Sequence, residues 1–460
     1  MTERHDGGSG SGKGRSRRRK RGGRGSRPHS QRSLHRARSH ETSQAEAELE
    51  APVAIPEHPL ICADDPQIIE TDAALAEFIA HARSVGRFAF DTEFIGELSY
   101  YPRLCLIQLA THERVALVDP LAGVNLDPVW AMVADPALQT LVHAGGQDFE
   151  PVSRLHGSRP ANVFDVQIAA GFCGLSYPVG LGRLIEELLE LRLGKGLTFT
   201  HWDHRPLSDV HARYAADDVR YLPALHDILL SSLRARGHEE WSALECQAQA
   251  EAAARERDVE GLFRRIKGMH QLRPRKLAVL RTLTVLREMA AREHDVPARS
   301  LVKDAVLLDL SRNPVSSVDK LAKVPGLPRR FAQAYGEAIV SATREALDLP
   351  REALPTLPPF ATETPGVQVR VDALNALAAN LCHARRIAPS LAVSRRDVAE
   401  LYDAFTHDRR DRDQCRLAQA WRRELVGGPL VDVLQGRSSV RLWWTEGHIR
   451  AEVQGPDCHV

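Results

Sequence analysis

Two acidic residues, Asp91 and Glu93, alternate along an apolar stretch from Phe88 to Phe94. In a strand, residues two apart project from the same face, so both carboxylates would lie side by side. Like charges this close repel each other and raise each other's pKa, and a cation between them relieves the repulsion. Carboxylate oxygens suit a hard divalent ion. Because this short pattern is common on surfaces, it indicates a metal site only if further ligands converge on it.

A third carboxylate, Asp148, follows a short apolar segment that ends at His143. Gly145 and Gly146 permit a tight turn between His143 and Asp148, and a helix is expected to begin at Asp148. The position therefore allows two interpretations. The acid either meets the favourable dipole at a helix N-terminus, or points at the edge of the sheet beside the first two acids.

A tyrosine and a fourth acid, Tyr214 and Asp218, lie four residues apart in a segment with helical character. Residues at this spacing share one face of a helix. The small side chains of Ala215 and Ala216 would let the helix approach a sheet closely. Asp217 points about 100° away from Asp218 and is expected to be solvated. Tyr214 could then orient a water molecule near the acids.

The order and spacing of these five residues resemble the DEDD exonuclease superfamily. The residues concerned are Asp91, Glu93, Asp148, Tyr214 and Asp218. The tyrosine places the resemblance in the DEDDy branch. The DEDDh branch would have a histidine five residues before the last acid, where this chain has Arg213.

The flanking segments resemble ribonuclease D. They are Phe90 to Phe94, Tyr101 to Leu109, Trp202 with Arg205-Pro206-Leu207, and Tyr214 to Asp218. Lys195 falls near a position where that family often has a lysine. His201 departs from the pattern, because the family usually has an acid beside the tryptophan.

The resemblance implies a ribonuclease H-like α/β domain, in which helices flank a mixed sheet. It also implies two divalent cations, Mg²⁺ or Mn²⁺. Asp91, Glu93 and Asp218 would hold one ion, and Asp91 with Asp148 the second. The implied reaction is 3′→5′ exoribonuclease hydrolysis that releases nucleoside 5′-monophosphates, with precursor tRNA or other structured RNA as substrate.

Three residues are candidates for contacts to nucleic acid. Lys195 and Arg205 could bind phosphates, and Trp202 could stack on a base. The alternative interpretation is structural, because a tryptophan followed by an Arg-Pro pair can simply pin a loop.

Composition and pattern divide the chain into six parts. We expect a disordered basic tail at 1–55, an exonuclease domain at 56–240, an HRDC domain at 265–348, a proline-rich linker at 349–365, a second HRDC-like helical domain at 366–437 and a C-terminal tail at 438–460. The two helical domains are assigned on a resemblance to HRDC modules. In the first, a predicted helix turns one apolar face inward and leaves Arg281, Arg287 and Arg292 on the other.

Four strands are expected in the exonuclease domain, at 87–94, 104–110, 115–118 and 140–143. Two helices are expected after them, at 181–191 and 210–230. No fold is assigned to residues 438–460.

The net charge of +1 combines a basic N-terminus with an acidic remainder, since residues 1–40 contain 13 Lys and Arg but 2 Asp and Glu. Such a tail suits a polyanion. Seven dispersed cysteines without a C-x-x-C pair are typical of reduced thiols, and on the same grounds zinc is not expected. No long apolar run predicts a membrane span. We therefore expect a cytoplasmic protein, as a monomer.

A nucleotide cofactor is not expected. Gly7, Gly12 and Lys13 imitate a phosphate-binding loop, but Gly14 stands where Ser or Thr is required.

Two other functions remain open at this stage. A 3′→5′ DNA exonuclease would use the same acids, because recognition of the 2′-hydroxyl cannot be read from the sequence. A catalytically inactive RNA-binding scaffold is the other alternative, although all four acids and the tyrosine are present.

Overall fold

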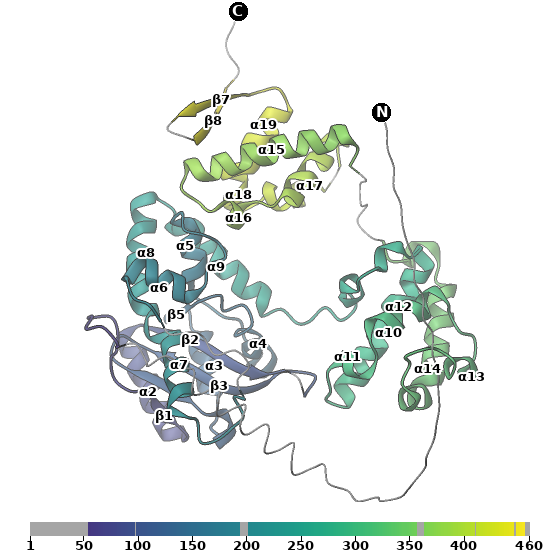
Figure 1. Cartoon of the computed structure of the whole chain (residues 1–460), viewed down its shortest axis with the longest axis horizontal. Coiled ribbons are helices and arrows are strands. Elements are labelled where there is room, and N and C mark those ends of the chain that lie inside the picture. Colours follow the sequence, from purple (N-terminus) through teal and green to yellow (C-terminus); the bar gives the residue numbers. More distant parts are fainter. Residues whose placement is uncertain are drawn as a thin grey trace, which may run out of the picture. The chain divides into compact units, whose positions relative to one another are not determined.

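A computed structural model describes residues 54–96, 98–193, 201–356, 363–409, 411–445 and 448–455. Within them lie a mixed sheet with its helices, two helical regions and a terminal hairpin (Figure 1). No helix in these ranges is both long and apolar enough to cross a membrane.

The sheet has six strands in the order β1-β4-β3-β2-β5-β6. Pairing of β2 with β3 and of β3 with β4 is antiparallel, and the other pairs are parallel. The sheet is therefore mixed, as predicted. Its strands are β1 (Gln67–Ile69), β2 (Arg87–Ile95), β3 (Arg103–Ala110), β4 (Val115–Val118), β5 (Gln139–Val142) and β6 (Val163–Asp165).

Strand β2 reads as a nearly continuous apolar run because both of its faces are covered. Phe90 packs on one face against Trp130 and Phe149. Ala89, on the opposite face, shares a buried cluster with Ala216. Strand β5 pairs with β2 only as far as Ala89, so the following residues of β2 extend beyond the paired part of β5.

Eight helices accompany the sheet in the described residues. They are α2 (Asp72–Val85), α3 (Asp127–Val133), α4 (Glu150–His156), α5 (Val166–Phe172), α6 (Leu181–Leu189), α7 (Asp209–Arg220), α8 (Leu222–Arg236) and α9 (Glu239–Ala253). Helix α7 packs against β2, β3 and β4, and Figure 1 shows it lying across these strands.

Two features of this domain differ from the prediction. The single helix expected at 210–230 is divided at Tyr221, and Pro223 is the second residue of the new helix α8. Helix α9 continues the compact domain beyond the predicted boundary at 240, since Ala250 lies in the sheet's buried core.

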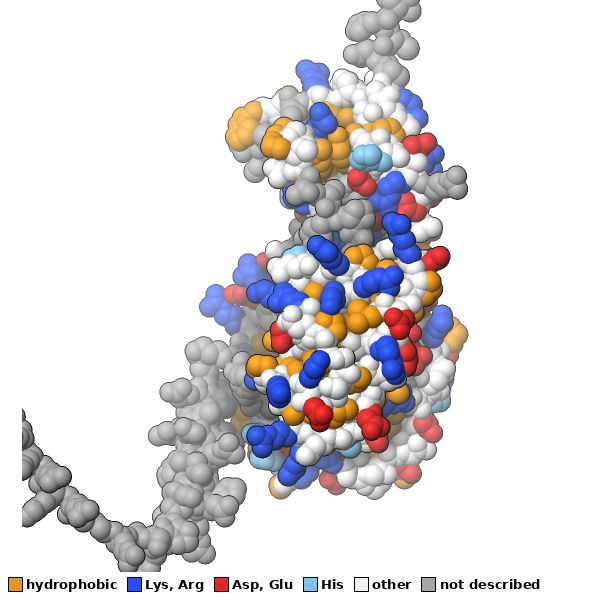
Figure 2. All heavy atoms as spheres, turned by 90° about the vertical axis from the view of Figure 1, so that its right-hand side faces the viewer, with side chains coloured by type: hydrophobic (Ala, Val, Ile, Leu, Met, Phe, Trp, Pro, Cys, Tyr) orange, Lys and Arg blue, Asp and Glu red, His pale blue; other side chains and the backbone are white. Residues whose placement is uncertain are grey.

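The first helical region has its own apolar core. It contains α10 (Pro274–Glu293), α11 (Ala298–Leu301), α12 (Asp304–Arg312), α13 (Val318–Leu321) and α14 (Arg329–Asp348). Figure 2, seen from the side of α12 to α14, shows Lys and Arg side chains mixed with apolar and acidic ones.

One arginine of this region was misplaced by the prediction. Arg287 is 4% exposed and donates to Asp304 and to the carbonyl of Val302. The assignment of Arg287 to an outer basic face of α10 is therefore wrong, and its charge is neutralised inside the bundle.

The second helical region repeats the start of the first. It contains α15 (Pro365–Ala384), α16 (Pro389–Ala392), α17 (Arg395–Thr406), α18 (Ala420–Arg422), a π-helical turn (Arg423–Gly427) and α19 (Gly428–Leu434). Helices α10 and α15 both have 20 residues, and α11 and α16 both have four. A left-handed residue, Asp295 or Arg386, stands between each long helix and the short one that follows. The two regions are offset by 91 residues. This is the separation between Asp295 and Arg386, and also that between Pro274, which begins α10, and Pro365, which begins α15.

A buried ion pair joins this second region to α9. Arg422 donates from both terminal nitrogens to the Glu245 carboxylate at 2.7 Å, and the Trp421 indole donates to it at 3.0 Å. The pair lies beside an apolar cluster that draws residues from both parts, so this end of the chain shares a core with the sheet domain.

The last described residues form a hairpin, although the sequence was expected to end in a tail. Strands β7 (Ser439–Thr445) and β8 (His448–Gln454) pair antiparallel. Trp444 is 69% exposed on it.

Candidate active site

Three of the predicted acids meet where β2 extends past β5. Ligand oxygens of Asp91, Glu93 and Asp218 all lie within 4.8 Å of one another. Asp91 and Glu93 share one face of β2, and α7 brings Asp218 to that face. The small, fully buried Ala215 and Ala216 permit this close approach of helix to sheet.

The fourth acid, Asp148, is held in the turn between β5 and α4. Its side chain accepts a hydrogen bond from the Thr92 hydroxyl, and its backbone N–H donates to the carbonyl of Gly145 at 3.3 Å. A Cβ on Gly145 would lie 2.8 Å from Cβ of Val142, so the turn requires glycine there. Asp148 is buried at 7% exposure and lies two residues before the start of α4, so the helix does not begin at Asp148 as predicted.

Burial and mutual repulsion make these acids hard to ionise. Burial, followed by the charges of Asp148, Asp218 and Glu93, raises the pKa of Asp91 well above its usual range. Burial and the charge of Glu93 raise the pKa of Asp218 in the same way. The predicted like-charge effect on these pKa values is therefore present.

Burial also raises the pKa values of Glu93 and Asp148. Burial and the charge of Asp148 raise the pKa of Glu93 to about 7, although a hydrogen bond from the Trp202 side chain opposes the shift. Burial raises the pKa of Asp148 to about 6 against the opposing hydrogen bond from Thr92. A divalent cation would stabilise the ionised forms, and the carboxylate oxygens are the ligands that hard cations prefer.

Tyr214 lies one helical turn before Asp218 on α7, as predicted. Burial and the charges of Asp218, Glu93 and Asp91 raise the pKa of its phenol. The hydroxyl therefore stays protonated at neutral pH, and it can donate a hydrogen bond but cannot act as a base.

The loop before α7 is held by Arg205. Its guanidinium donates to both carboxylate oxygens of buried Asp119, at 2.5 and 2.7 Å, and to the carbonyls of Trp202, His204 and Cys105 at 2.8 Å. These contacts show Arg205 holding the loop in place. They favour the structural interpretation of the Arg-Pro element over phosphate binding.

Trp202 is also packed rather than open to a base. It is 4% exposed, and its ring lies 6.3 Å from that of Tyr214 between centroids. Lys195 lies outside the described residues.

Asp217 is not solvated, contrary to the prediction. It pairs with Arg213 and with fully buried Arg220, at 2.9 Å each, and its side chain is 18% exposed. Arg220 in turn donates to the carbonyl of Cys62, so this acid helps to hold the N-terminal part of the domain.

Comparison with known proteins places this geometry in a family. A family model described as 3′-5′ exonuclease matches residues 66–234, and one described as HRDC domain matches residues 276–343. Ribonuclease D of Gluconacetobacter diazotrophicus is 34% identical over 81% of this chain and 94% of its own length. The crystal structure of Escherichia coli RNase D, "an exoribonuclease involved in structured RNA processing", has a TM-score of 0.72 at 31% identity and covers 81% of this chain and 99% of that one.

The chain belongs to the ribonuclease D family. As a ribonuclease D family member with a 3′-5′ exonuclease domain, it is a 3′→5′ exoribonuclease. The exonuclease family is divalent-metal dependent, and the described residues of this chain include an acidic cluster that offers oxygen ligands.

Three supporting contacts of this site escaped the sequence analysis. Thr92 binds Asp148, the Trp202 side chain binds Glu93, and Asp165 accepts from the backbone N–H of Ala144 at 3.1 Å. Asp165 was visible as an N-cap, because an acid follows two apolar residues and precedes a helical segment. The other two contacts join distant segments and leave no local signal.

Proposed function

We propose that this chain trims the 3′ ends of structured RNA, such as precursor tRNA, and releases nucleoside 5′-monophosphates with the help of two Mg²⁺ or Mn²⁺ ions. The observation that carries this proposal is the meeting of Asp91, Glu93 and Asp218 at one end of β2, in a chain of the ribonuclease D family. The charge of Asp148 acts on Asp91 and Glu93, and Tyr214 lies one helical turn before Asp218. We also propose that it works in the cytoplasm as a monomer.

The residues present fit two hard cations. Asp91, Glu93 and Asp218 offer oxygen ligands close together for one ion, and Asp91 with Asp148 would share the second. Bound ions in such a pair supply a nucleophilic water and stabilise the leaving 3′ oxygen. Because the carboxylates repel one another without ions, the site favours their binding.

The chain's own groups position the reactants. Tyr214, kept protonated by its surroundings, would orient the attacking water by donating or accepting a hydrogen bond. The Trp202 side chain fixes Glu93, and Thr92 fixes Asp148, so neither carboxylate needs to reorganise during the reaction.

The two helical regions would grip the RNA rather than act on it. The second region repeats the first in helix lengths and in its left-handed residue, which supports the assignment of a second HRDC-like domain at 366–437. Arg281 and Arg292 of α10 remain candidates for phosphate contacts, as do Lys195 and Arg205. Trp202 was a candidate for base stacking, and its burial favours a packing role. The anchoring of Arg205 to Asp119 favours an indirect role for that residue.

The substrate is tested by trimming of matched molecules. A 5′-labelled tRNA with a 3′ extension and a single-stranded DNA of equal length would be incubated separately with the protein and Mg²⁺. We expect faster shortening of the RNA from its 3′ end and 5′-mononucleotides as the product. Faster trimming of DNA would favour a DNA exonuclease, and tight RNA binding without trimming under Mg²⁺ or Mn²⁺ would leave an RNA-binding scaffold.

A further inference from the structure

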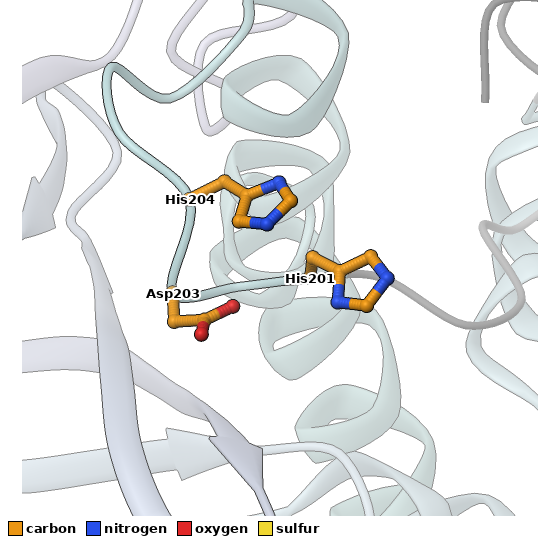
Figure 3. Close-up of side chains that lie close together, drawn as sticks. All are labelled: His201, Asp203 and His204. Carbon is orange, nitrogen blue, oxygen red and sulfur yellow. The ribbon is translucent and has the colours of Figure 1, made fainter. Parts of the chain in front are cut away.

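A second group of possible metal ligands lies on the loop before α7. One ligand atom each of His201, Asp203 and His204 lies within 4.8 Å of the other two. Figure 3 shows a nitrogen of each ring and an oxygen of Asp203 turned toward a common space. Imidazole and carboxylate together form a different donor set from the oxygens of the acidic site.

The backbone that carries these three side chains is fixed. The N–H of His204 donates to the carbonyl of His201 at 3.0 Å, which closes a tight turn. Arg205 donates to the carbonyls of Trp202 and His204, and is itself held by Asp119. Because the turn is already ordered, little backbone entropy remains to be lost when a ligand binds.

One oxygen of the Asp203 carboxylate, Oδ1, is buried without a hydrogen-bond partner. A buried acceptor without a partner is costly, so a cation or a donor at this point would stabilise it. The two neighbouring rings are exposed and stack with centroids 4.8 Å apart, at an interplanar angle of 14°. Exposed side chains rotate within nanoseconds, so these rings can turn to share an ion.

We propose that His201, Asp203 and His204 bind a transition-metal ion of the Zn²⁺ class, separate from the ions of the acidic site. Two imidazoles and a carboxylate suit a borderline metal better than Mg²⁺. Three protein ligands leave a fourth tetrahedral position for water or a substrate oxygen. Bonds of about 2.0–2.2 Å require the three ligand atoms to move closer together, which rotation of the rings supplies.

Trp202 links the proposed ion site to the acidic site. Trp202, between two of the ligands in sequence, is buried against Tyr214, and its side chain forms a hydrogen bond with Glu93. An ion that holds His201 to His204 therefore restrains the segment that supports Glu93.

The test measures zinc bound to the full chain, prepared without a histidine tag. Zinc would be added at one equivalent in the presence of a large excess of Mg²⁺, and the retained metal quantified after dialysis. X-ray absorption at the zinc edge then reports whether imidazole is coordinated. We expect one retained zinc with an imidazole signature in the wild-type chain.

Variants identify the ligands. His201→Ala, His204→Ala and the isosteric Asp203→Asn are each expected to weaken zinc binding at least roughly 10-fold. His383→Ala, which removes an exposed histidine elsewhere, and Asp91→Asn, which alters the acidic site, should leave the retained zinc unchanged. Thermal melting of each variant verifies that it is folded.

Two results would overturn the proposal. One is zinc that is retained with unchanged imidazole coordination in His204→Ala and His201→Ala. The other is wild-type protein that retains no zinc, or retains it with oxygen ligands alone and loses it in Asp91→Asn.

Discussion

At the scale of single residues, the acids of the candidate site are harder to ionise in the folded protein than in water, because burial raises their pKa values. The pKa of Glu93 is raised to about 7, whereas its ordinary value is 4.5. Between these two values the folded state keeps a proton that the unfolded state has lost. Stability of the metal-free protein therefore falls as pH rises from 4.5 to 7, and the loss is complete above 7.

Glu93→Gln should remove this loss. In EDTA at pH 8, we expect the variant to be more stable than the wild-type chain by about 3–4 kcal/mol, because the pKa rises from 4.5 to about 7 and one pKa unit corresponds to about 1.4 kcal/mol. At pH 4 the two proteins should be nearly equal. Urea unfolding at both pH values measures the difference, with Asp209→Asn as a control on an exposed acid of α7. An equal difference at both pH values would contradict the assigned cause.

Tyr214→Phe removes only the hydroxyl that is proposed to orient water. We expect kcat to fall about 100-fold, because misplacing a reactant costs about this much. Metal affinity should change little, since Tyr214 is not a proposed ligand. Single-turnover trimming and Mg²⁺ titration separate the two effects. A variant that loses metal affinity and rate in parallel would instead make Tyr214 part of the ion site.

At the scale of elements, the turn after β5 decides where Asp148 stands. Gly145→Ala would place a Cβ within 2.8 Å of Val142, whereas a Cβ on Gly146 meets nothing within 4 Å. We expect Gly145→Ala to lower kcat/KM at least roughly 10-fold, because the turn must shift to relieve the contact. Gly146→Ala serves as the matched control and should stay within about twofold of wild type. Equal activities of the two variants would show that the turn does not position Asp148.

The sequence was a good guide to elements with a strong pattern. The strands β2 to β5 begin and end within one residue of the prediction, because each combines apolar side chains with clear boundaries. Strands β1 and β6 were missed, since three residues are too few to show an alternation. The division between α7 and α8 was also missed, although Pro223 marks it.

The candidate site was predictable from residue spacing rather than from an apolar pattern. Its acids come from three segments, but each segment has its own spacing rule, so the set could be assembled without knowing the contacts. The pairing of Asp217 was missed although Arg220 lies only three residues later on the same helix, α7. Arg205 and Arg287 were harder, because their partners Asp119 and Asp304 come from other elements. Whether a charge is solvated or paired inside the fold depends on those tertiary contacts.

At the scale of the whole molecule, a strongly basic N-terminus precedes the catalytic and helical regions. Residues 1–40 contain 13 Lys and Arg. We expect deletion of residues 1–55 to weaken RNA binding most at low salt, because phosphate contacts release counterions. Affinity measured over a range of salt concentrations should show a shallower dependence for the shortened chain. Equal affinities at low ionic strength would exclude a role for this segment in binding.

The central claim is that the four carboxylates at the end of β2 perform metal-dependent trimming of RNA. The most direct measurement compares the wild-type chain, Asp91→Asn and the control Asp209→Asn on a 5′-labelled, 3′-extended tRNA with Mg²⁺. We predict a ladder that shortens from the 3′ end for wild type and control. EDTA should abolish it, and Asp91→Asn should slow it roughly 10³-fold or more, about 4 kcal/mol of barrier. Trimming that survives both EDTA and Asp91→Asn would contradict the account.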